Sequence, residues 1–127
     1  MGEGTSIGRV RGLGSAHSGS HHWLLQRFTA VGNVVLSIWL VVSLLMLPNF
    51  HYITVHDWIA HLFPATAMGL LLICTFWHAR LGMQVMLEDY IHTSSGKFAA
   101  FAVLNMATFA GILFGLICVL RLALGGA

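Results

Sequence analysis

One histidine lies in the middle of a long apolar stretch of this sequence. His78 follows the apolar run 70–77 and precedes the apolar run 81–87. An ionisable side chain is costly inside a hydrocarbon layer and usually has a function there, and a neutral imidazole is a common axial ligand of haem iron. A hydrogen bond to a neighbouring helix is the alternative. Gly82, one helical turn further on the same face, favours the haem, because it leaves room for a flat macrocycle or a neighbouring helix to approach.

The number of intramembrane histidines predicts that this chain holds only half of a haem site. A low-spin b-type haem takes two axial ligands. The other histidine on the same predicted helix, His61, lies 17 residues earlier, which is roughly 25 Å along an ideal helix. The apolar stretches of the other predicted spans contain no histidine. The second ligand of a haem bound to His78 would therefore come from another chain or from a second copy of this one.

Asp89 and Tyr90 place further polar chemistry near the same helix face. If the helix continues that far, Asp89 returns to within about 20° of the His78 direction and lies roughly 16 Å nearer the membrane surface. A phenol at this depth can donate a hydrogen bond to a quinone carbonyl while the quinone tail stays in lipid, and the carboxylate can orient the phenol or relay protons. A solvated helix end with an interfacial aromatic residue is the simpler interpretation.

The composition predicts that a membrane positions these residues. Of the 127 residues, 57% are hydrophobic and only 8% are charged, which is too apolar for an ordinary soluble domain. Apolar runs near 28–47, 58–87 and 98–120 each reach the roughly 20 residues that a hydrocarbon layer of about 30 Å requires. The predicted fold is an all-α integral membrane protein, with a polar N-terminal arm over residues 1–22 and a three-helix membrane domain over residues 23–127. The few, dispersed charges exclude nucleic acid as a partner.

The basic residues predict the orientation of the spans. Three arginines precede the first span and one lysine lies in the second connection, whereas the first connection contains neither type. Because cytoplasmic segments carry the excess of Lys and Arg, the N-terminus should face the cytoplasm, or the matrix in a mitochondrion. These basic residues are Arg9, Arg11, Arg27 and Lys97.

Gly111 and Gly115 form a G-x-x-x-G pair that permits close helix contact.

The motif around His78 resembles that of a known family. The run H-A-R-L-G-M-Q-V-M-L-E-D-Y, residues 78–90, resembles the H-x-R-x-G…D-Y signature of the D-type hydrophobic membrane anchor of succinate dehydrogenase. The segments G-L-G-S-A (12–16), H-W (22–23) and Q-R-F-T-A (26–30) are similar to the amino-terminal block of that family. The resemblance covers most of the chain.

The resemblance implies a role for four residues. It makes His78 an axial ligand of haem b, and Tyr90 a hydrogen-bond donor to ubiquinone with Asp89 beside it. It brings Arg27 near the haem propionates and the quinone pocket, although an arginine at the start of a span also serves as an interfacial anchor. The second haem ligand would come from a C-type, cytochrome b556-like anchor subunit, packed with this chain in one helix bundle.

The resemblance also implies partners and a place in the cell. The chain has no dinucleotide fingerprint and no four-cysteine iron–sulfur spacing, so it does not oxidise succinate itself. A flavoprotein and an iron–sulfur subunit would do this and pass electrons to ubiquinone, in the inner (plasma) membrane of a bacterium or the mitochondrial inner membrane. Three alternatives stay open: a fumarate reductase anchor, a haem-free membrane subunit, and a proton-relay protein that uses His78 and Asp89.

Overall fold

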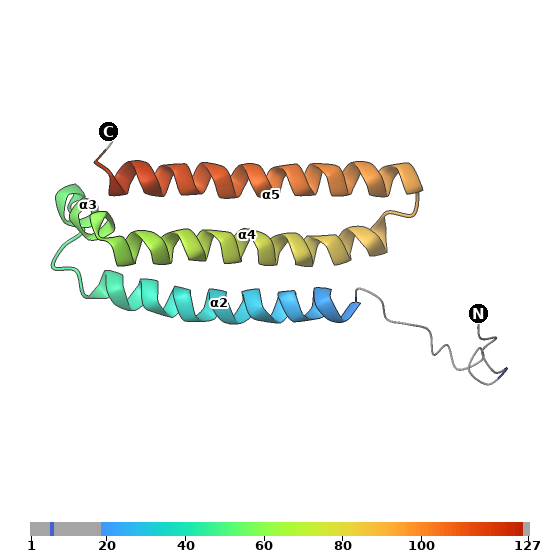
Figure 1. Ribbon diagram of the computed structural model, residues 1–127, viewed down its shortest axis with the longest axis horizontal. Coiled ribbons are helices and arrows are strands. Elements are labelled where there is room, and N and C mark those ends of the chain that lie inside the picture. The colour runs from blue at the N-terminus through green and yellow to red at the C-terminus, as the bar shows by residue number, and fades with distance from the viewer. Residues whose placement is uncertain (1–5, 7–18, 126–127) are drawn as a thin grey trace.

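The chain folds into long helices joined by short connections. The computed structural model describes residue 6 and residues 19–125, and within them the helices are α2 (Gly19–Leu45), α3 (Tyr52–Ala60), α4 (Leu62–Tyr90) and α5 (Ser94–Ala123) (Figure 1). No strand occurs in this described part. The predicted arm falls mostly outside it, as do Arg9 and Arg11.

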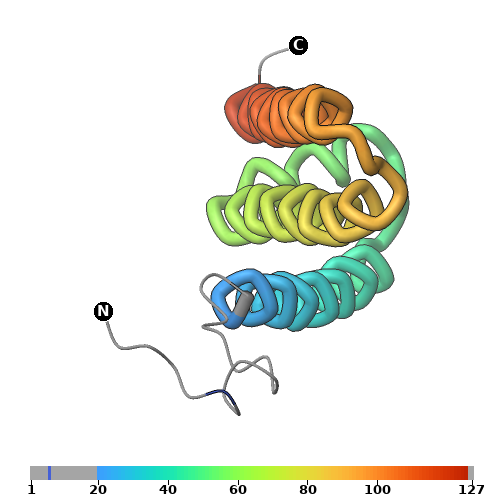
Figure 2. The backbone as a smooth tube through the Cα atoms, turned by 90° about the vertical axis from the view of Figure 1, so that its right-hand side faces the viewer, coloured from blue at the N-terminus to red at the C-terminus, as the bar shows by residue number. Residues whose placement is uncertain are grey.

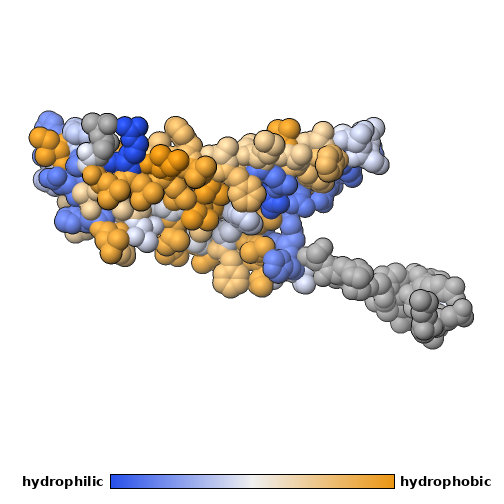
Figure 3. All heavy atoms as spheres, turned by 45° about the horizontal axis from the view of Figure 1, so that its top comes forward, coloured by the Kyte–Doolittle hydropathy of each residue, from blue (hydrophilic) through white to orange (hydrophobic). Residues whose placement is uncertain are grey.

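Three of the helices are long and apolar enough to cross a membrane. The candidate spans contain 26, 29 and 30 residues and cover Ser20–Leu45, Leu62–Tyr90 and Ser94–Ala123. An ideal helix of 20 residues already extends about 30 Å, the thickness of the hydrocarbon layer. Apolar side chains cover the middle of the visible surface and hydrophilic ones gather toward its ends (Figure 3). The predicted all-α membrane fold with three spans is confirmed.

The three spans form a flat row with α4 in the middle. Figures 1 and 2 show α2, α4 and α5 stacked in this order and running antiparallel to their neighbours. The helix α4 contacts both α2 and α5, whereas α2 and α5 do not touch within the described residues. The start of α2 and the connection between α4 and α5 lie at the same end of the row, which we call the N-side end (Figure 1). Arg27 and Lys97 both belong to this end.

The predicted second helix is in fact two helices. His61 has extended backbone angles, with φ −73° and ψ 141°, and separates α3 from α4. The reason is Pro64, whose ring would clash with the carbonyl of residue 60 in a continuous helix. Proline is tolerated in a first helical turn, so α4 restarts just before it. The prediction of one helix over 58–87 is therefore wrong at its start.

The other helix boundaries also differ from the apolar runs. The helix α2 begins at Gly19, so the last four residues of the predicted arm are helical, and it ends at Leu45, shortly before Pro48. Proline disfavours helical angles in the residue before it. The helix α5 extends beyond the predicted 98–120 on both sides. Hydropathy locates the segment that lies in lipid, whereas backbone hydrogen bonding continues into the polar flanks.

Glycines set the spacing between α4 and α5. A Cβ atom added at Gly111 would overlap the ring of Phe76, and one added at Gly115 would lie 3.0 Å from Leu72 Cδ1. The two glycines therefore receive the side chains of two successive turns of α4, which confirms the helix contact expected from their spacing. This packing fixes the rotation of α4 about its axis, and with it the face on which His78 lies.

Candidate functional site

His78 faces α2 and contacts a hydroxyl group there. The Nδ1 atom of His78 lies 3.1 Å from Oγ1 of Thr29, and the pair is partly buried. The same hydroxyl donates to backbone carbonyls one turn earlier, with Oγ1 2.9 Å from Leu25 O and 3.2 Å from Gln26 O. The imidazole is thus fixed through Nδ1, and its Nε2 atom makes no hydrogen bond within the described part of the chain.

Thr29 belongs to a polar row along α2 that faces α4. Four polar residues of α2 follow one another at intervals of four, three and four positions, which places them on one helix face. At the far end of the row, Asn33 Oδ1 accepts a hydrogen bond of 3.2 Å from Thr75 Oγ1 on α4. In the part nearer the start of α2, the contact between α2 and α4 is therefore a polar seam. Its α2 residues are His22, Gln26, Thr29 and Asn33.

Two atoms of this seam are buried without a partner. His22 Nε2 and Gln26 Oε1 are shielded from solvent and make no hydrogen bond to any described residue. Opposite them, a Cβ atom added at Gly82 would meet only Gln26 Nε2, at 4.0 Å. Buried polar atoms without a partner are uncommon in folded proteins, which makes this part of the seam a candidate for further polar contacts.

Asp89 and Tyr90 end α4 at the N-side end. The helix continues to Tyr90, so Asp89 does return to within about 20° of the His78 direction, roughly 16 Å along the axis. The side chain of Tyr90 is 79% exposed, and within the described residues neither side chain makes a hydrogen bond. The connection is held by its neighbours, since Lys97 Nζ donates to the Glu88 carbonyl at 3.1 Å. Both predicted quinone residues thus remain available to a ligand.

Arg27 lies on a different side of α2 from the seam. Two residues along a helix correspond to a rotation of about 200°, so Arg27 points away from the direction of Thr29. Its guanidinium stacks over the ring of Trp23 at 5.3 Å, and the residue is exposed. Within this chain, the structure does not bring Arg27 together with His78.

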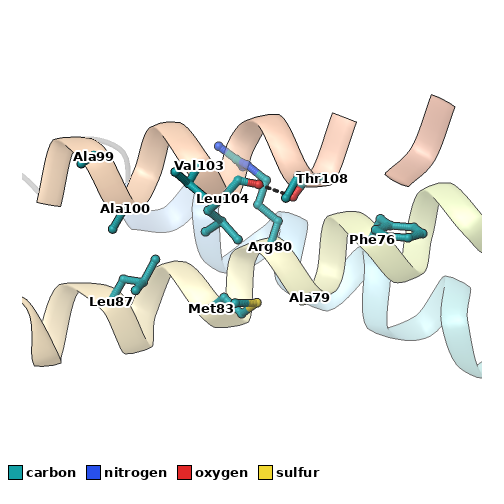
Figure 4. A pocket seen from close by; sticks show the side chains of 11 residues that line it. Phe76, Ala79, Arg80, Met83, Leu87, Ala99, Ala100, Val103, Leu104 and Thr108 are labelled. Atoms are coloured by element: carbon teal, nitrogen blue, oxygen red, sulfur yellow. Dashed lines mark hydrogen bonds between the residues drawn. The ribbon is translucent and has the colours of Figure 1, made fainter. Parts of the chain in front are cut away.

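Arg80 lies on the opposite side of α4 from His78. Its Nε atom donates to Oδ1 of Asn105 on α5, and its guanidinium lies 5.4 Å from the centre of the Trp77 ring. Figure 4 shows the side chain extending from α4 toward α5, in an apolar groove of about 580 Å³ that several alanines line. The sequence patterns described above do not predict this pair. Asn105, an amide in the apolar run of α5, was the available signal.

The histidine fits a haem better than a free metal ion. No group of three or more His, Cys, Asp or Glu side chains converges within the described residues. A structural zinc or similar ion needs several protein ligands, whereas a haem brings four nitrogen ligands of its own and needs only axial ones. One fixed imidazole with an available Nε2 atom meets that need for one side of the iron.

These features define a multi-pass membrane protein with a polar helix contact around His78. Residues 1–115 match the family model described as succinate dehydrogenase/fumarate reductase transmembrane subunit. The chain belongs to this family.

Named relatives agree with this family. The chain is 38% identical over 86 residues to the succinate dehydrogenase hydrophobic membrane anchor subunit of Rickettsia conorii, and 44% identical over 87 residues to that of Rickettsia bellii. Each match covers 67% of this chain and 68% of the relative. It is also 31% identical over 78 residues to the succinate dehydrogenase membrane anchor subunit of Reclinomonas americana, covering 59% of this chain and 65% of the relative.

Proposed function

We propose that this chain is a membrane anchor subunit of a succinate:ubiquinone oxidoreductase. Its family and the names of its relatives support this role. The partners would be a flavoprotein, an iron–sulfur subunit and a second, C-type anchor, in a bacterial plasma membrane or a mitochondrial inner membrane. The family also includes fumarate reductase subunits, but the relatives above carry the succinate dehydrogenase name, which favours quinone reduction.

His78 is the proposed axial ligand of a haem b shared with the second anchor. The observation that carries this proposal is the contact of its Nδ1 atom with Thr29, because it orients the ring and leaves Nε2 unused. A bound haem supplies one-electron redox chemistry. The flat row leaves the faces of α4 open, so an imidazole from another chain can approach.

Tyr90 and Asp89 are the proposed residues of this chain in the ubiquinone site. The exposed phenol of Tyr90 would donate a hydrogen bond to a quinone carbonyl, and the Asp89 carboxylate would hold a proton for transfer to the reduced oxygen. Their place at a helix end suits a quinone whose tail stays in lipid. Arg27 points away from the seam, so a haem propionate or quinone in contact with it would lie on the outer side of α2.

The decisive experiment for the haem replaces His78 in the assembled complex. His78→Leu should abolish or alter the low-spin b-haem absorption spectrum, because leucine cannot bind iron. His51→Leu is a matched control, since His51 is an exposed histidine at the start of α3. A complex with His78→Leu that keeps the spectrum and midpoint potential of the unmodified complex would exclude His78 as a ligand.

A further inference from the structure

The contact between Thr29 and His78 determines which imidazole nitrogen carries the proton. A threonine hydroxyl has one hydrogen to donate and two lone pairs to accept with. Oγ1 of Thr29 lies within hydrogen-bond distance of two backbone carbonyls, at 2.9 and 3.2 Å, and of His78 Nδ1 at 3.1 Å. A carbonyl oxygen can only accept a hydrogen bond, so the single proton of the Thr29 hydroxyl points toward the carbonyl oxygens of Leu25 and Gln26.

The alternative arrangement is unfavourable. If the hydroxyl donated to Nδ1 instead, its oxygen would present lone pairs to the Leu25 carbonyl at 2.9 Å, with no proton between the two oxygens. With the proton on the carbonyl side, Nδ1–H donates to Oγ1, and all three groups are satisfied. The chain of hydrogen bonds then runs from the imidazole through the hydroxyl to the backbone of α2, each bond polarising the next.

We infer that Thr29 is the positioning residue of His78: it holds the imidazole in the tautomer protonated at Nδ1, with the Nε2 lone pair directed away from α2. The effect of Thr29 on the redox potential rests on the proposed role of His78 as a haem ligand. The tautomer of His78 does not depend on a haem. A hydrogen-bond acceptor at the second nitrogen of a ligating histidine fixes the ring and raises its basicity as a ligand. Thr29 would thus favour ferric over ferrous iron.

The chain offers a matched control for this inference. Thr108 on α5 makes the same kind of bond to the carbonyl one turn earlier, with Oγ1 2.8 Å from Leu104 O, and it is buried at 4% exposure. Thr108 contacts no histidine in the described structure. Thr29→Val and Thr108→Val therefore each remove one threonine hydroxyl and its hydrogen bond to the preceding helical turn. Only Thr29→Val also removes the hydrogen-bond partner of an imidazole. Thr29→Ser keeps the hydroxyl and should restore the contact.

The first measurement follows the haem in the assembled complex. Thr29→Val should weaken haem retention by about 10- to 100-fold, the usual loss when a partner of a ligating histidine is removed. It should also raise the haem midpoint potential. The rise is about 59 mV for each tenfold decrease in the ratio of the affinity for ferric haem to the affinity for ferrous haem. Thr29→Ser and Thr108→Val should behave as the unmodified complex does. Equal retention and potential in Thr29→Val and Thr108→Val would overturn the redox consequence.

The second measurement separates this inference from the haem proposal. Nitrogen-15 NMR of histidine-labelled complex, purified from haem-limited cells, reports the tautomer of His78, with its signal assigned by loss in His78→Leu. We expect Nδ1–H in the unmodified protein and in Thr29→Ser, and a mixed or reversed tautomer in Thr29→Val. An Nε2–H tautomer in the unmodified protein, or no change in Thr29→Val, refutes the inference. If His78→Leu instead keeps its haem, the haem proposal fails while the NMR result still decides the role of Thr29.

Discussion

Replacing Tyr90 with phenylalanine removes one hydroxyl at the N-side end of α4 and changes little else. The side chain is 79% exposed, and its hydroxyl makes no hydrogen bond within the described residues, so the helices should pack as before. In the proposed quinone site, the loss falls on the bound quinone. A hydrogen bond between neutral groups contributes about 0.5–1.5 kcal/mol. Since about 1.4 kcal/mol is a factor of ten, quinone reduction should slow about two- to tenfold.

The assay compares two electron acceptors in the assembled complex. Reduction of a ubiquinone analogue by succinate should fall in Tyr90→Phe, whereas reduction of an artificial acceptor upstream of the membrane should stay normal. Tyr52→Phe is the matched control, because the chain has two tyrosines and Tyr52, 69% exposed, lies on α3 at the other end of the row. If both variants reduce the analogue at the unmodified rate and respond equally to a quinone-site inhibitor, the assignment of Tyr90 is wrong.

Two further predictions concern the contact between α4 and α5. Asn105→Leu deprives the Arg80 guanidinium of its acceptor and should destabilise the complex in detergent by about 0.5–2 kcal/mol, the usual range for a hydrogen bond between membrane helices. An unchanged melting temperature would show that Arg80 needs no such partner. Gly111→Leu should cost about 1–3 kcal/mol, because its side chain would overlap the Phe76 ring. In Gly82→Ala the new Cβ atom would make only an ordinary contact, 4.0 Å from Gln26 Nε2, so the three helices should pack as before. A melting temperature of Gly111→Leu equal to that of the unmodified complex would contradict this packing.

The membrane fold can be predicted from the sequence alone, but the polar seam cannot. Long apolar runs dominate the energetics of insertion, so the three spans follow from hydropathy alone. The break at His61 could have been predicted from Pro64, whose clash with the preceding turn is a local effect. The contact of Thr29 with His78 could not, because it depends on how two helices rotate against each other. The regular spacing of polar residues along α2 was visible in the sequence, but it does not say which helix they face.

Arg80 shows the same difference between local and tertiary information. The rotation of about 200° between His78 and Arg80 follows from helix geometry and correctly separates the two residues. The bond to Asn105 requires that α4 packs against α5. Two glycines of α5 and two larger side chains of α4 fix this packing, and their contact exists only when the two helices lie side by side. Sequence patterns therefore assign residues to helix faces, and packing decides which faces meet.

The flat row of helices bears on the order in which this protein is made and assembled. Each span satisfies its backbone hydrogen bonds internally, so the chain can insert into the bilayer alone. A single layer nevertheless leaves α4 open to lipid on both broad sides, between its contacts with α2 and α5. With the proposed second anchor covering one of these sides, the newly inserted chain is an assembly intermediate that cellular proteases can recognise, and we expect its lifetime to depend on the supply of that anchor.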